Sequence, residues 1–312
     1  MPFFSVIIPL YNKKPYIKNT LKSVLNQSFK DFEIIVINDG SNDGSIDEVH
    51  QITDDRLVIY NQSNSGVSMA RNLGIKKANS KYIALIDADD FWKPNHLQEH
   101  YNSIQKFPEA DLFCNAYALK LSKNHIINAR YSSPKKAHPH IIDNYFKASC
   151  IHPIGWTSAI TFNKKSFDDI GGFNPKYPVV EDLDLLIKFG LKKTIVFNPV
   201  TTCWYDKTVV GSLSKESHHQ DIKYELFNSF KAEEEAFPYL KKYLTLNKYS
   251  LAIQCKLANN KTTFKKLYPT IDKSLLNSKQ RLLLIAPVFT TKLAKKIHSF
   301  LIKKNIYFTA YN

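Results

Sequence analysis

Residues 4–10 read Phe-Ser-Val-Ile-Ile-Pro-Leu, a short and nearly continuous apolar run. Such a run is typical of a parallel strand that is buried on both faces of a sheet. The segment from Pro15 to about Gln27 follows, with a proline near its first turn and apolar residues on one face, and predicts a helix. Residues 32–38 form a second apolar run, which the turn sequence of residues 39–44 ends.

The same alternation continues to residue 86. It predicts a strand over 57–60, a helix over 67–78 and a strand over 82–86. This β-α-β order indicates a doubly wound α/β sheet with right-handed crossovers. Ligands of such sheets bind at the carboxyl ends of the strands. Here those ends carry Pro9-Leu10-Tyr11-Asn12, Asn38-Asp39-Gly40 and Asp87-Ala88-Asp89-Asp90.

The second half of the chain has a different pattern. Between about 111 and 211 it is mixed, with strand-like runs at 112–119, 157–162 and 194–198 and a helix beginning near Glu181. After Ser217 it is typical of helices, including 222–236 and 292–304. The change in composition predicts a boundary near residue 215.

Composition limits the class of protein. The chain has 312 residues, 44% of them hydrophobic and 13% aromatic, which excludes disorder as its main state. No apolar run approaches the roughly 20 residues of a membrane-spanning helix, and the N-terminus does not resemble a signal peptide. The four cysteines form no Cys-x-x-Cys pair and are expected to be reduced. We therefore expect a cytoplasmic protein.

The net charge of +15 is unevenly distributed. Residues 221–312 contain 17 basic and 6 acidic side chains, whereas residues 1–220 contain 26 and 22. A surface that binds nucleic acid throughout would not divide in this way. The sequence predicts a nearly neutral first part and a basic C-terminal region that meets something anionic other than nucleic acid.

Two nucleotide-binding motifs are missing from the sequence. No Gly-x-Gly-x-x-Gly follows the first strand, and there is no Walker A loop, so a Rossmann dehydrogenase or a P-loop NTPase is disfavoured. The end of the first strand instead carries Tyr11, which is placed either to stack on a base or simply to lie in a surface loop.

Three carboxylates stand together in Asp87-Ala88-Asp89-Asp90, directly after an apolar run. Carboxylates this close repel one another unless a cation neutralises them. A hard divalent ion such as Mn²⁺ or Mg²⁺ binds one or two carboxylates and keeps positions for phosphate oxygens, so the cluster predicts a metal site that holds a diphosphate. The alternative is a solvated acidic turn, with Asp90 near the N-cap of a helix before Pro94.

A second acidic pair, Glu181-Asp182, begins the later helix. A carboxylate at the mouth of a site can accept a proton from an attacking hydroxyl group, particularly if burial raises its pKa. The alternative is that the pair only complements the helix dipole.

Together these features resemble the family 2 glycosyltransferases, whose fold is the Rossmann-like GT-A nucleotide-sugar-binding fold. The resemblance covers residues 3 to about 215 and excludes the basic C-terminal region. It rests on Ser5-Val6-Ile7-Ile8-Pro9-Leu10-Tyr11-Asn12, Ser23-Val24-Leu25-Asn26-Gln27-Ser28, Phe32-Glu33-Ile34-Ile35-Val36-Ile37-Asn38-Asp39-Gly40-Ser41, Gly66-Val67-Ser68-Met69-Ala70-Arg71-Asn72-Leu73-Gly74, Tyr82-Ile83-Ala84-Leu85-Ile86-Asp87-Ala88-Asp89-Asp90, Gly171-Gly172-Phe173-Asn174 and Glu181-Asp182-Leu183-Asp184.

The resemblance implies a catalytic domain over 1–215, with a nucleotide half at about 1–110 and an acceptor half at about 111–215, followed by a basic, mainly helical region over 216–312. It implies a UDP pocket and a divalent metal, Mn²⁺ or Mg²⁺, with Asp89 as the direct ligand. The implied nucleotide-binding residues are Pro9, Tyr11, Asp39, Arg71 and Asp87, and the implied metal ligands are Asp89 and Asp87. In the family the aromatic residue stacks on uracil and the aspartate of the second strand hydrogen-bonds the base.

The implied general base is Asp182, with Glu181 as the alternative. Acceptor contacts are implied at His152, Trp156 and Asp184. For His152 and Trp156 an ordinary packed position stays open, and Asp184 has either a structural or an acceptor-orienting role. One departure concerns Asp206, which stands where many members carry a basic residue or histidine, so that only His218 or His219 is left as a candidate third metal ligand.

The resulting hypothesis is an inverting transferase that moves a sugar from a UDP-sugar to a hydroxyl group of a glycan or a lipid-linked glycan. Two alternatives stay open. One is an inactive protein that binds nucleotide sugars as a scaffold, although the acidic residues are intact. The other is a nucleotidyltransferase, although the glycines of its usual loop are missing after Leu10.

The segment Lys292–Lys304 predicts an amphipathic helix with Leu293, Ile297, Phe300 and Leu301 on one side. Its five lysines suit an anionic membrane surface, such as the inner face of the cell membrane. Packing of this stripe on the rest of the protein is the alternative.

Overall fold

The computed structural model describes residues 1–122, 124–133, 136–209 and 219–303. The chain divides into two compact units. The first consists of Met1–Tyr145 and Pro153–Val210, and the second of Phe146–His152 and Gly211–Asn312. Nothing in the sequence indicated that residues 146–152 group with the C-terminal helices.

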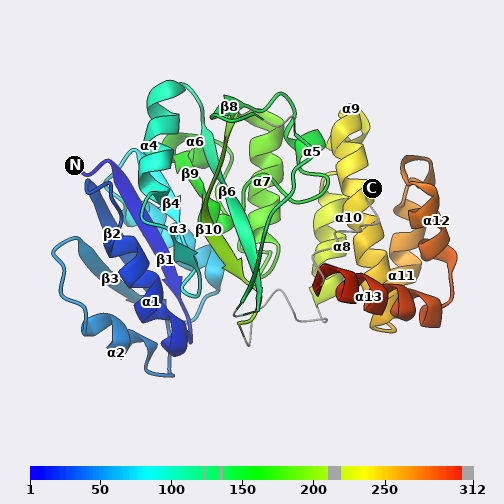
Figure 1. Ribbon diagram of the computed structural model, residues 1–312, viewed down its shortest axis with the longest axis horizontal. Coiled ribbons are helices and arrows are strands. Elements are labelled where there is room, and N and C mark those ends of the chain that lie inside the picture. Colours follow the sequence, from blue (N-terminus) through cyan, green and yellow to red (C-terminus); the bar gives the residue numbers. More distant parts are fainter. Residues whose placement is uncertain (123, 134–135, 210–218, 304–312) are drawn as a thin grey trace. The chain divides into compact units, whose positions relative to one another are not determined.

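The first unit is built on one mixed sheet of ten strands (Figure 1). Eight of them follow the order β3-β2-β1-β4-β9-β6-β10-β5, while β7 pairs with β6 and β8 pairs with β10. The strands are β1 (Phe4–Leu10), β2 (Phe32–Asp39), β3 (Leu57–Gln62), β4 (Tyr82–Leu85), β5 (Phe91–Trp92), β6 (Leu112–Ser122), β7 (His125–Asn128), β8 (His140–Ile141), β9 (Ile160–Asn163) and β10 (Ile195–Asp206).

Strands β1 to β4 are parallel, and this arrangement creates the site. Strand β1 pairs with β2 from Phe4↔Phe32 to Leu10↔Asn38, and with β4 from Phe4↔Tyr82 to Ile7↔Leu85. The carboxyl ends of the three strands therefore meet at one edge of the sheet. Beyond β4 the direction changes, because β9 is antiparallel to both β4 and β6.

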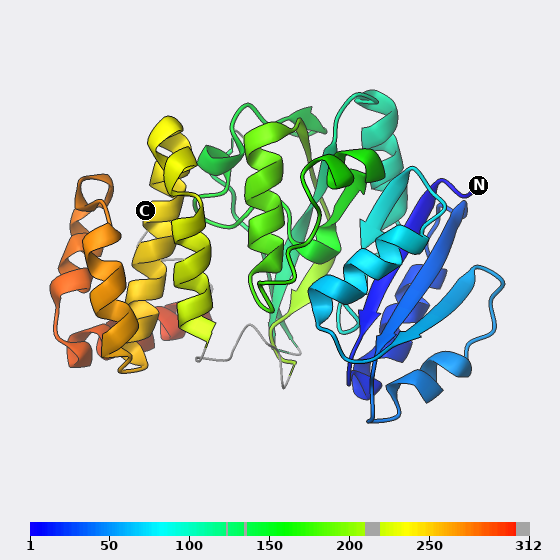
Figure 2. The ribbon, with the colours of Figure 1, turned by 180° about the vertical axis from the view of Figure 1, so that it is seen from behind.

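Helices cover both faces of this sheet. The helices of the first unit are α1 (Lys14–Leu25), α2 (Ser45–His50), α3 (Val67–Lys77), α4 (His96–Lys106), α6 (Lys164–Asp169) and α7 (Glu181–Lys192), while α5 (Tyr145–Ala148) spans the division between the units. Helix α1 lies over one face of β1, and α3 lies over the other face (Figures 1 and 2). The expected doubly wound order is thus confirmed.

Alternate residues of β1 face the two helices. Ile8 and Leu10 are fully buried in the cluster that contains Ile17 and Leu21 of α1. On the opposite face α3 approaches the sheet so closely that a Cβ at Gly74 would lie 2.5 Å from Ile7 Cγ2. Glycine is required here because the helix backbone itself packs on the strand.

Three local expectations were wrong. The run at 157–162 begins as a 3₁₀ turn over Thr157–Ala159, and only Ile160–Asn163 is a strand. The helix expected over 222–236 is two helices, which meet at Phe230 without a proline or glycine to mark the break. Asp90 caps no helix, since α4 begins at His96 with Asn95 as its N-cap.

The second unit is helical in its described part. Its helices are α8 (Gln220–Ser229), α9 (Lys231–Ala236), α10 (Pro238–Leu257), α11 (Lys261–Leu267), α12 (Ser278–Ile285) and α13 (Val288–Lys303), with 3₁₀ turns at Tyr268–Thr270 and Lys273–Leu275. Helix α10 contacts all the other five helices and buries Leu240, Leu244 and Cys255 completely. No described helix has both the length and the apolar character needed to cross a bilayer.

Candidate active site

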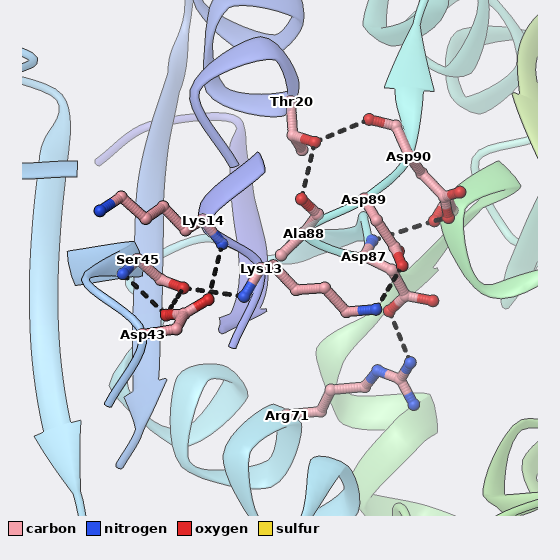
Figure 3. A network of polar contacts seen from close by, with 11 residues as sticks. Lys13, Lys14, Thr20, Asp43, Ser45, Arg71, Asp87, Ala88, Asp89 and Asp90 are labelled. Carbon is pink, nitrogen blue, oxygen red and sulfur yellow. Dashed lines mark hydrogen bonds and ion pairs between the residues drawn. The ribbon is translucent and has the colours of Figure 1, made fainter. Parts of the chain in front are cut away.

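The loop after β1 is tied to the loop after β2 by backbone hydrogen bonds. The Lys13 amide donates to Ser45 Oγ over 2.8 Å, and the Lys14 amide donates to Asp43 Oδ2 over 3.0 Å (Figure 3). Asn12 adopts a left-handed backbone with φ of 50° and accepts from the Asn42 amide over 2.9 Å. The loop that carries Tyr11 is therefore held in one conformation, while the Tyr11 side chain itself is 45% exposed and free to meet a ligand.

Asp39 fixes a second loop of the site. Its carboxylate accepts from Gln62 Nε2 over 2.6 Å, from the Ser65 amide over 2.8 Å and from the Gly66 amide over 2.9 Å. A carboxylate offers about four acceptor positions, so these three donors leave one position of the buried Asp39 unused. Pro9 lies in β1 and is partly buried.

The acidic loop at 87–90 is held from two sides. Thr20 of α1 places its hydroxyl 3.0 Å from Ala88 O and 2.9 Å from Asp90 O (Figure 3). Ser158 Oγ accepts from the Asp87 amide over 3.0 Å and donates to Asp90 Oδ2 over 2.6 Å. Asp90 therefore points into the protein, whereas the side chains of Asp87 and Asp89 are 28% and 17% exposed.

Two cations neutralise the exposed carboxylates. Arg71 bridges Asp87 and Glu181, with nitrogen–oxygen distances of 2.6 Å to each, and its side chain is only 3% exposed. Lys13 Nζ lies 2.6 Å from Asp89 Oδ2 (Figure 3). Protein cations thus pair with these carboxylates, whereas the sequence predicted a metal ion as the neutralising cation.

Burial and mutual repulsion act on the protonation of this cluster. Burial, together with the Asp87 charge, raises the pKa of Asp89, against the lowering effect of Lys13. Burial and the charges of Asp89 and Asp87 hold the pKa of Asp90 well above its usual range. Asp90 therefore serves as a buried, hydrogen-bonded anchor and is poorly suited to bind a cation.

Helix α7 brings the second acidic pair to the site. It begins after Val180, whose φ of 61° is left-handed, and this turn directs Glu181 and Asp182 inward. Burial raises the pKa of Glu181 to about 7, although Arg71 acts in the opposite direction. Burial also raises the pKa of Asp182, whose Oδ1 accepts from the Leu183 amide over 2.7 Å. A raised pKa suits a carboxylate that must accept a proton.

The predicted acceptor residues have different surroundings. Trp156 is partly buried, and its ring centroid lies 5.5 Å from that of Tyr117 and 5.0 Å from that of Tyr205. Asp184 is buried and paired with Lys188 over 2.6 Å, which favours the structural role.

Four other candidate residues gain no support from the structure as site residues. His152 belongs to the second unit. Asp206 is paired with Lys120 over 2.7 Å. Of the two histidines considered as a third metal ligand, His219 is the N-cap of α8, and His218 lies outside the described residues.

The sequence was compared with models of known protein families, and one of them matches most of the part of the chain that carries this site. Residues 5–171 match the model of glycosyl transferase family 2. The chain belongs to this family. The expected family is therefore confirmed, and the GT-A fold with a helical C-terminal region is confirmed with it.

Individual relatives of this family 2 chain support the same conclusion. It is 27% identical over 298 residues to an uncharacterised glycosyltransferase of Rickettsia conorii, covering 91% of this chain and 47% of the relative. It is 42% identical over 101 residues to the putative teichuronic acid biosynthesis glycosyltransferase TuaG of Bacillus subtilis, covering 31% of this chain and 40% of the relative. The chain spans less than half the length of these relatives.

Solved structures with low sequence identity share the fold of the family 2 chain. S. aureus TarS 1–349 in complex with UDP-GlcNAc is similar with a TM-score of 0.70 and 16% identity, covering 98% of this chain and 93% of TarS. The mannosyltransferase PcManGT from Pyrobaculum calidifontis, in complex with GDP-Man and Mn²⁺, is similar with a TM-score of 0.60 and 14% identity. The match covers 99% of this chain and 82% of PcManGT.

The donor set of the family 2 site fits a divalent ion. No group of three or more histidine, cysteine, aspartate or glutamate side chains gathers as a metal cage within the described residues. Mn²⁺ and Mg²⁺ do not need such a cage when phosphate oxygens and water complete the coordination. Asp87 and Asp89 are partly exposed, and their ion pairs with Arg71 and Lys13 use Oδ1 of Asp87 and Oδ2 of Asp89, so the second oxygen of each carboxylate is left to meet an ion.

Sequence reasoning missed three residues of this site. Lys13 pairs with Asp89, while Thr20 and Ser158 hold the acidic loop. Lys13 has a signal in the sequence, because it follows Tyr11 by two residues in the loop after the first strand. Thr20 and Ser158 have none, since a hydroxyl side chain in a helix or a loop is common.

Proposed function

We propose that the chain is an inverting glycosyltransferase, which moves a sugar from a UDP-sugar to a hydroxyl group of a glycan or lipid-linked glycan acceptor. The observation that carries this proposal is the buried guanidinium of Arg71, which holds Asp87 and Glu181 at 2.6 Å each. It brings the end of β4, where a diphosphate would bind, next to Asp182 at the start of α7.

The donor assignment rests on the loops after β1 and β2. Tyr11 is exposed at the end of β1 and would stack on uracil, and the free acceptor position of Asp39 would meet a donor group of the base. The likeness to TarS, which was solved with UDP-GlcNAc, supports a UDP-sugar.

Asp87 and Asp89 would hold a Mn²⁺ or Mg²⁺ ion, with Asp89 as the direct ligand. When bound, such an ion stabilises the negative charge of the departing diphosphate. The likeness to PcManGT, solved with Mn²⁺, supports this choice of ion class.

Asp182 would act as the general base. It accepts the proton of the acceptor hydroxyl while the hydroxyl oxygen forms a bond to the anomeric carbon. The bond from that carbon to the diphosphate oxygen breaks with its electron pair on UDP. In a single displacement of this kind the hydroxyl group attacks from the face opposite the departing UDP, so the proposed reaction inverts the configuration at the anomeric carbon.

We place the protein in the cytoplasm, with peripheral contact to the inner face of the cell membrane. Five large apolar side chains of the second unit are at least half exposed on α12 and α13: Leu282 (64%), Ile285 (69%), Phe289 (71%), Leu293 (57%) and Ile297 (52%). Lys292, Lys295 and Lys296 are exposed beside them. Exposed apolar and basic side chains on the same helix suit an anionic lipid surface.

This apolar set differs in part from the predicted stripe. Leu293 and Ile297 are common to both. The side chains of Phe300 and Lys303, and the whole of Lys304, lie outside the described residues. Leu282, Ile285 and Phe289 extend the exposed set toward α12, which the sequence did not indicate. We further propose that residues 1–215 form the catalytic domain and that residues 216–312 hold this domain at the membrane surface.

Incubation with radiolabelled UDP-sugars and Mn²⁺ tests the proposed reaction. Release of UDP with label on an acceptor supports a transferase. Formation of UTP and a sugar 1-phosphate after pyrophosphate is added would instead indicate a nucleotidyltransferase, and bound but unchanged donor would indicate a scaffold. The α- or β-configuration of the new bond, read by NMR, decides whether the reaction inverts.

Asp89→Ala should lower turnover by at least about 10²-fold, because the negative charge of the diphosphate would lose its main counterion. Initial rates with and without Mn²⁺ measure this effect. Asp55→Ala removes an exposed carboxylate that lies outside the site and serves as the control. Full wild-type activity in excess EDTA would contradict the metal assignment.

A further inference from the structure

Lys13 has a fixed backbone and a long, partly exposed side chain. It is the N-cap of α1. Its amide donates to Ser45 Oγ over 2.8 Å, and its carbonyl accepts from the amides of Tyr16 and Ile17 over 2.9 and 3.0 Å. Only the side chain can therefore move without disturbing the helix.

The two cations of the site differ in how firmly they are held. Arg71 has two carboxylate partners and is 3% exposed, so it is part of the rigid framework. The Lys13 side chain is 21% exposed, and among the described ion pairs its partner is Asp89 alone. A single ion pair that water reaches is a weak interaction and can exchange.

Asp89 holds an ammonium group and a divalent ion together only at a cost in electrostatic repulsion. It is the carboxylate assigned to the divalent ion, and it now holds an ammonium group at 2.6 Å. An ammonium group and a divalent cation on the same carboxylate would repel each other strongly at this distance. Binding of the ion therefore favours a shift of Lys13 Nζ away from Asp89.

We propose that Lys13 is an internal counterion, which occupies Asp89 in the free protein and moves to the diphosphate when the divalent ion arrives with its nucleotide. The proposal rests on the proposed function. The displaced ammonium group needs a new anion, and it stays tethered two residues from Tyr11, at the loop assigned to the donor. The ion and the nucleoside diphosphate should thus bind cooperatively.

The test compares Mn²⁺ binding in the presence and absence of UDP. Free Mn²⁺ is measured by electron paramagnetic resonance for the wild type, Lys13→Gln and Lys14→Gln. Lys14 is exposed, and Lys14→Gln removes the same charge as Lys13→Gln from the neighbouring position. Lys13→Gln should bind Mn²⁺ alone about tenfold more tightly than the wild type, and the gain in Mn²⁺ affinity caused by UDP should fall by a similar factor. Lys14→Gln should match the wild type.

Lys13→Arg keeps a cation at this position and should restore the weak binding of Mn²⁺ alone, which separates a charge effect from damage to the loop. If Lys13→Gln binds Mn²⁺ alone as the wild type does, the inference about Lys13 is overturned while the proposed function stands. If the wild type itself binds neither Mn²⁺ nor UDP, both are overturned.

Discussion

Asp182 is the residue to which we assign the general base of the proposed reaction. Asp182→Asn should lower kcat by about 10²–10⁴-fold, because asparagine cannot accept the acceptor proton. The affinity for UDP should stay within about twofold, since the residues that we assign to the nucleotide lie on other elements. Initial rates and calorimetric titration with UDP measure the two effects.

Glu181→Gln is the matched comparison for this prediction. It leaves Asp182 in place but removes one of the two charges that hold Arg71, so it should reduce thermal stability more than Asp182→Asn does. Wild-type turnover in Asp182→Asn, with strong loss in Glu181→Gln, would move the base to Glu181.

Residue types at the site could be predicted from the sequence, but their partners could not. Carboxylates at the end of an apolar run indicate a cation site because repulsion must be neutralised. Which cation does so depends on distant segments: Lys13 and Asp89 are 76 residues apart, and Arg71 and Glu181 are 110 apart. No local pattern reports such pairings.

Among the elements, α1 supports the acidic loop through one hydroxyl group. Thr20→Val keeps the shape of the side chain but leaves Ala88 O and Asp90 O without this donor. The free energy of unfolding should fall by about 1–3 kcal/mol, and Mn²⁺ affinity with UDP should fall as well. Urea titration and Mn²⁺ binding measure these effects. Thr20→Ser keeps the hydroxyl, so equal losses in both variants would contradict the assignment.

Helix α4 contributes two buried histidines that should make stability depend on pH. His96 stacks on Trp92 at 4.1 Å and contacts the His100 ring at 4.7 Å. Burial holds the pKa of His96 well below its usual value and lowers the pKa of His100 to about 3. In the unfolded chain both pKa values return to about 6.5.

The unfolded chain therefore takes up protons first as the pH falls. The two neutral histidines make their full contribution to the free energy of unfolding well above pH 6.5. As the pH falls from 7.5 to 5.5, the free energy of unfolding decreases by about 1.4 kcal/mol for each histidine. His100→Phe should reduce this loss by roughly half in urea titrations. The exposed His50 serves as the control, since His50→Gln should keep the wild-type dependence.

The parallel elements could be predicted because their strands are continuous apolar runs and their helices have one apolar face. Three short strands, β5, β7 and β8, have two to four residues and no periodicity of their own. The break between α8 and α9 at Phe230 could not be predicted either, because this side chain is 6% exposed and fits the apolar pattern of one continuous helix.

For the whole molecule, the exposed apolar side chains of α12 and α13 predict reversible binding to anionic membranes. Replacing Lys292, Lys295 and Lys296 together by glutamine should weaken binding about 100-fold, because each lysine contributes roughly 1 kcal/mol. Sedimentation with anionic liposomes at low and high salt measures this binding.

A triple variant of the exposed Lys22, Lys76 and Lys77 removes equal charge from the first unit and should bind as the wild type does. Absence of binding at low salt would contradict the membrane proposal. Unchanged binding after deletion of residues 290–312 would contradict it equally.

The position of β9 in the sheet has a consequence for synthesis of the chain. Strand β4 pairs with β1 on one side and with β9 on the other, and all four of its residues are buried. While the ribosome adds residues 86–159, one apolar edge of β4 has no partner strand. At about 5–20 residues per second this interval lasts roughly 4 to 15 s. An open apolar edge is a template for pairing with other chains, so the nascent protein is most prone to aggregate just after strands β1 to β4 have been made.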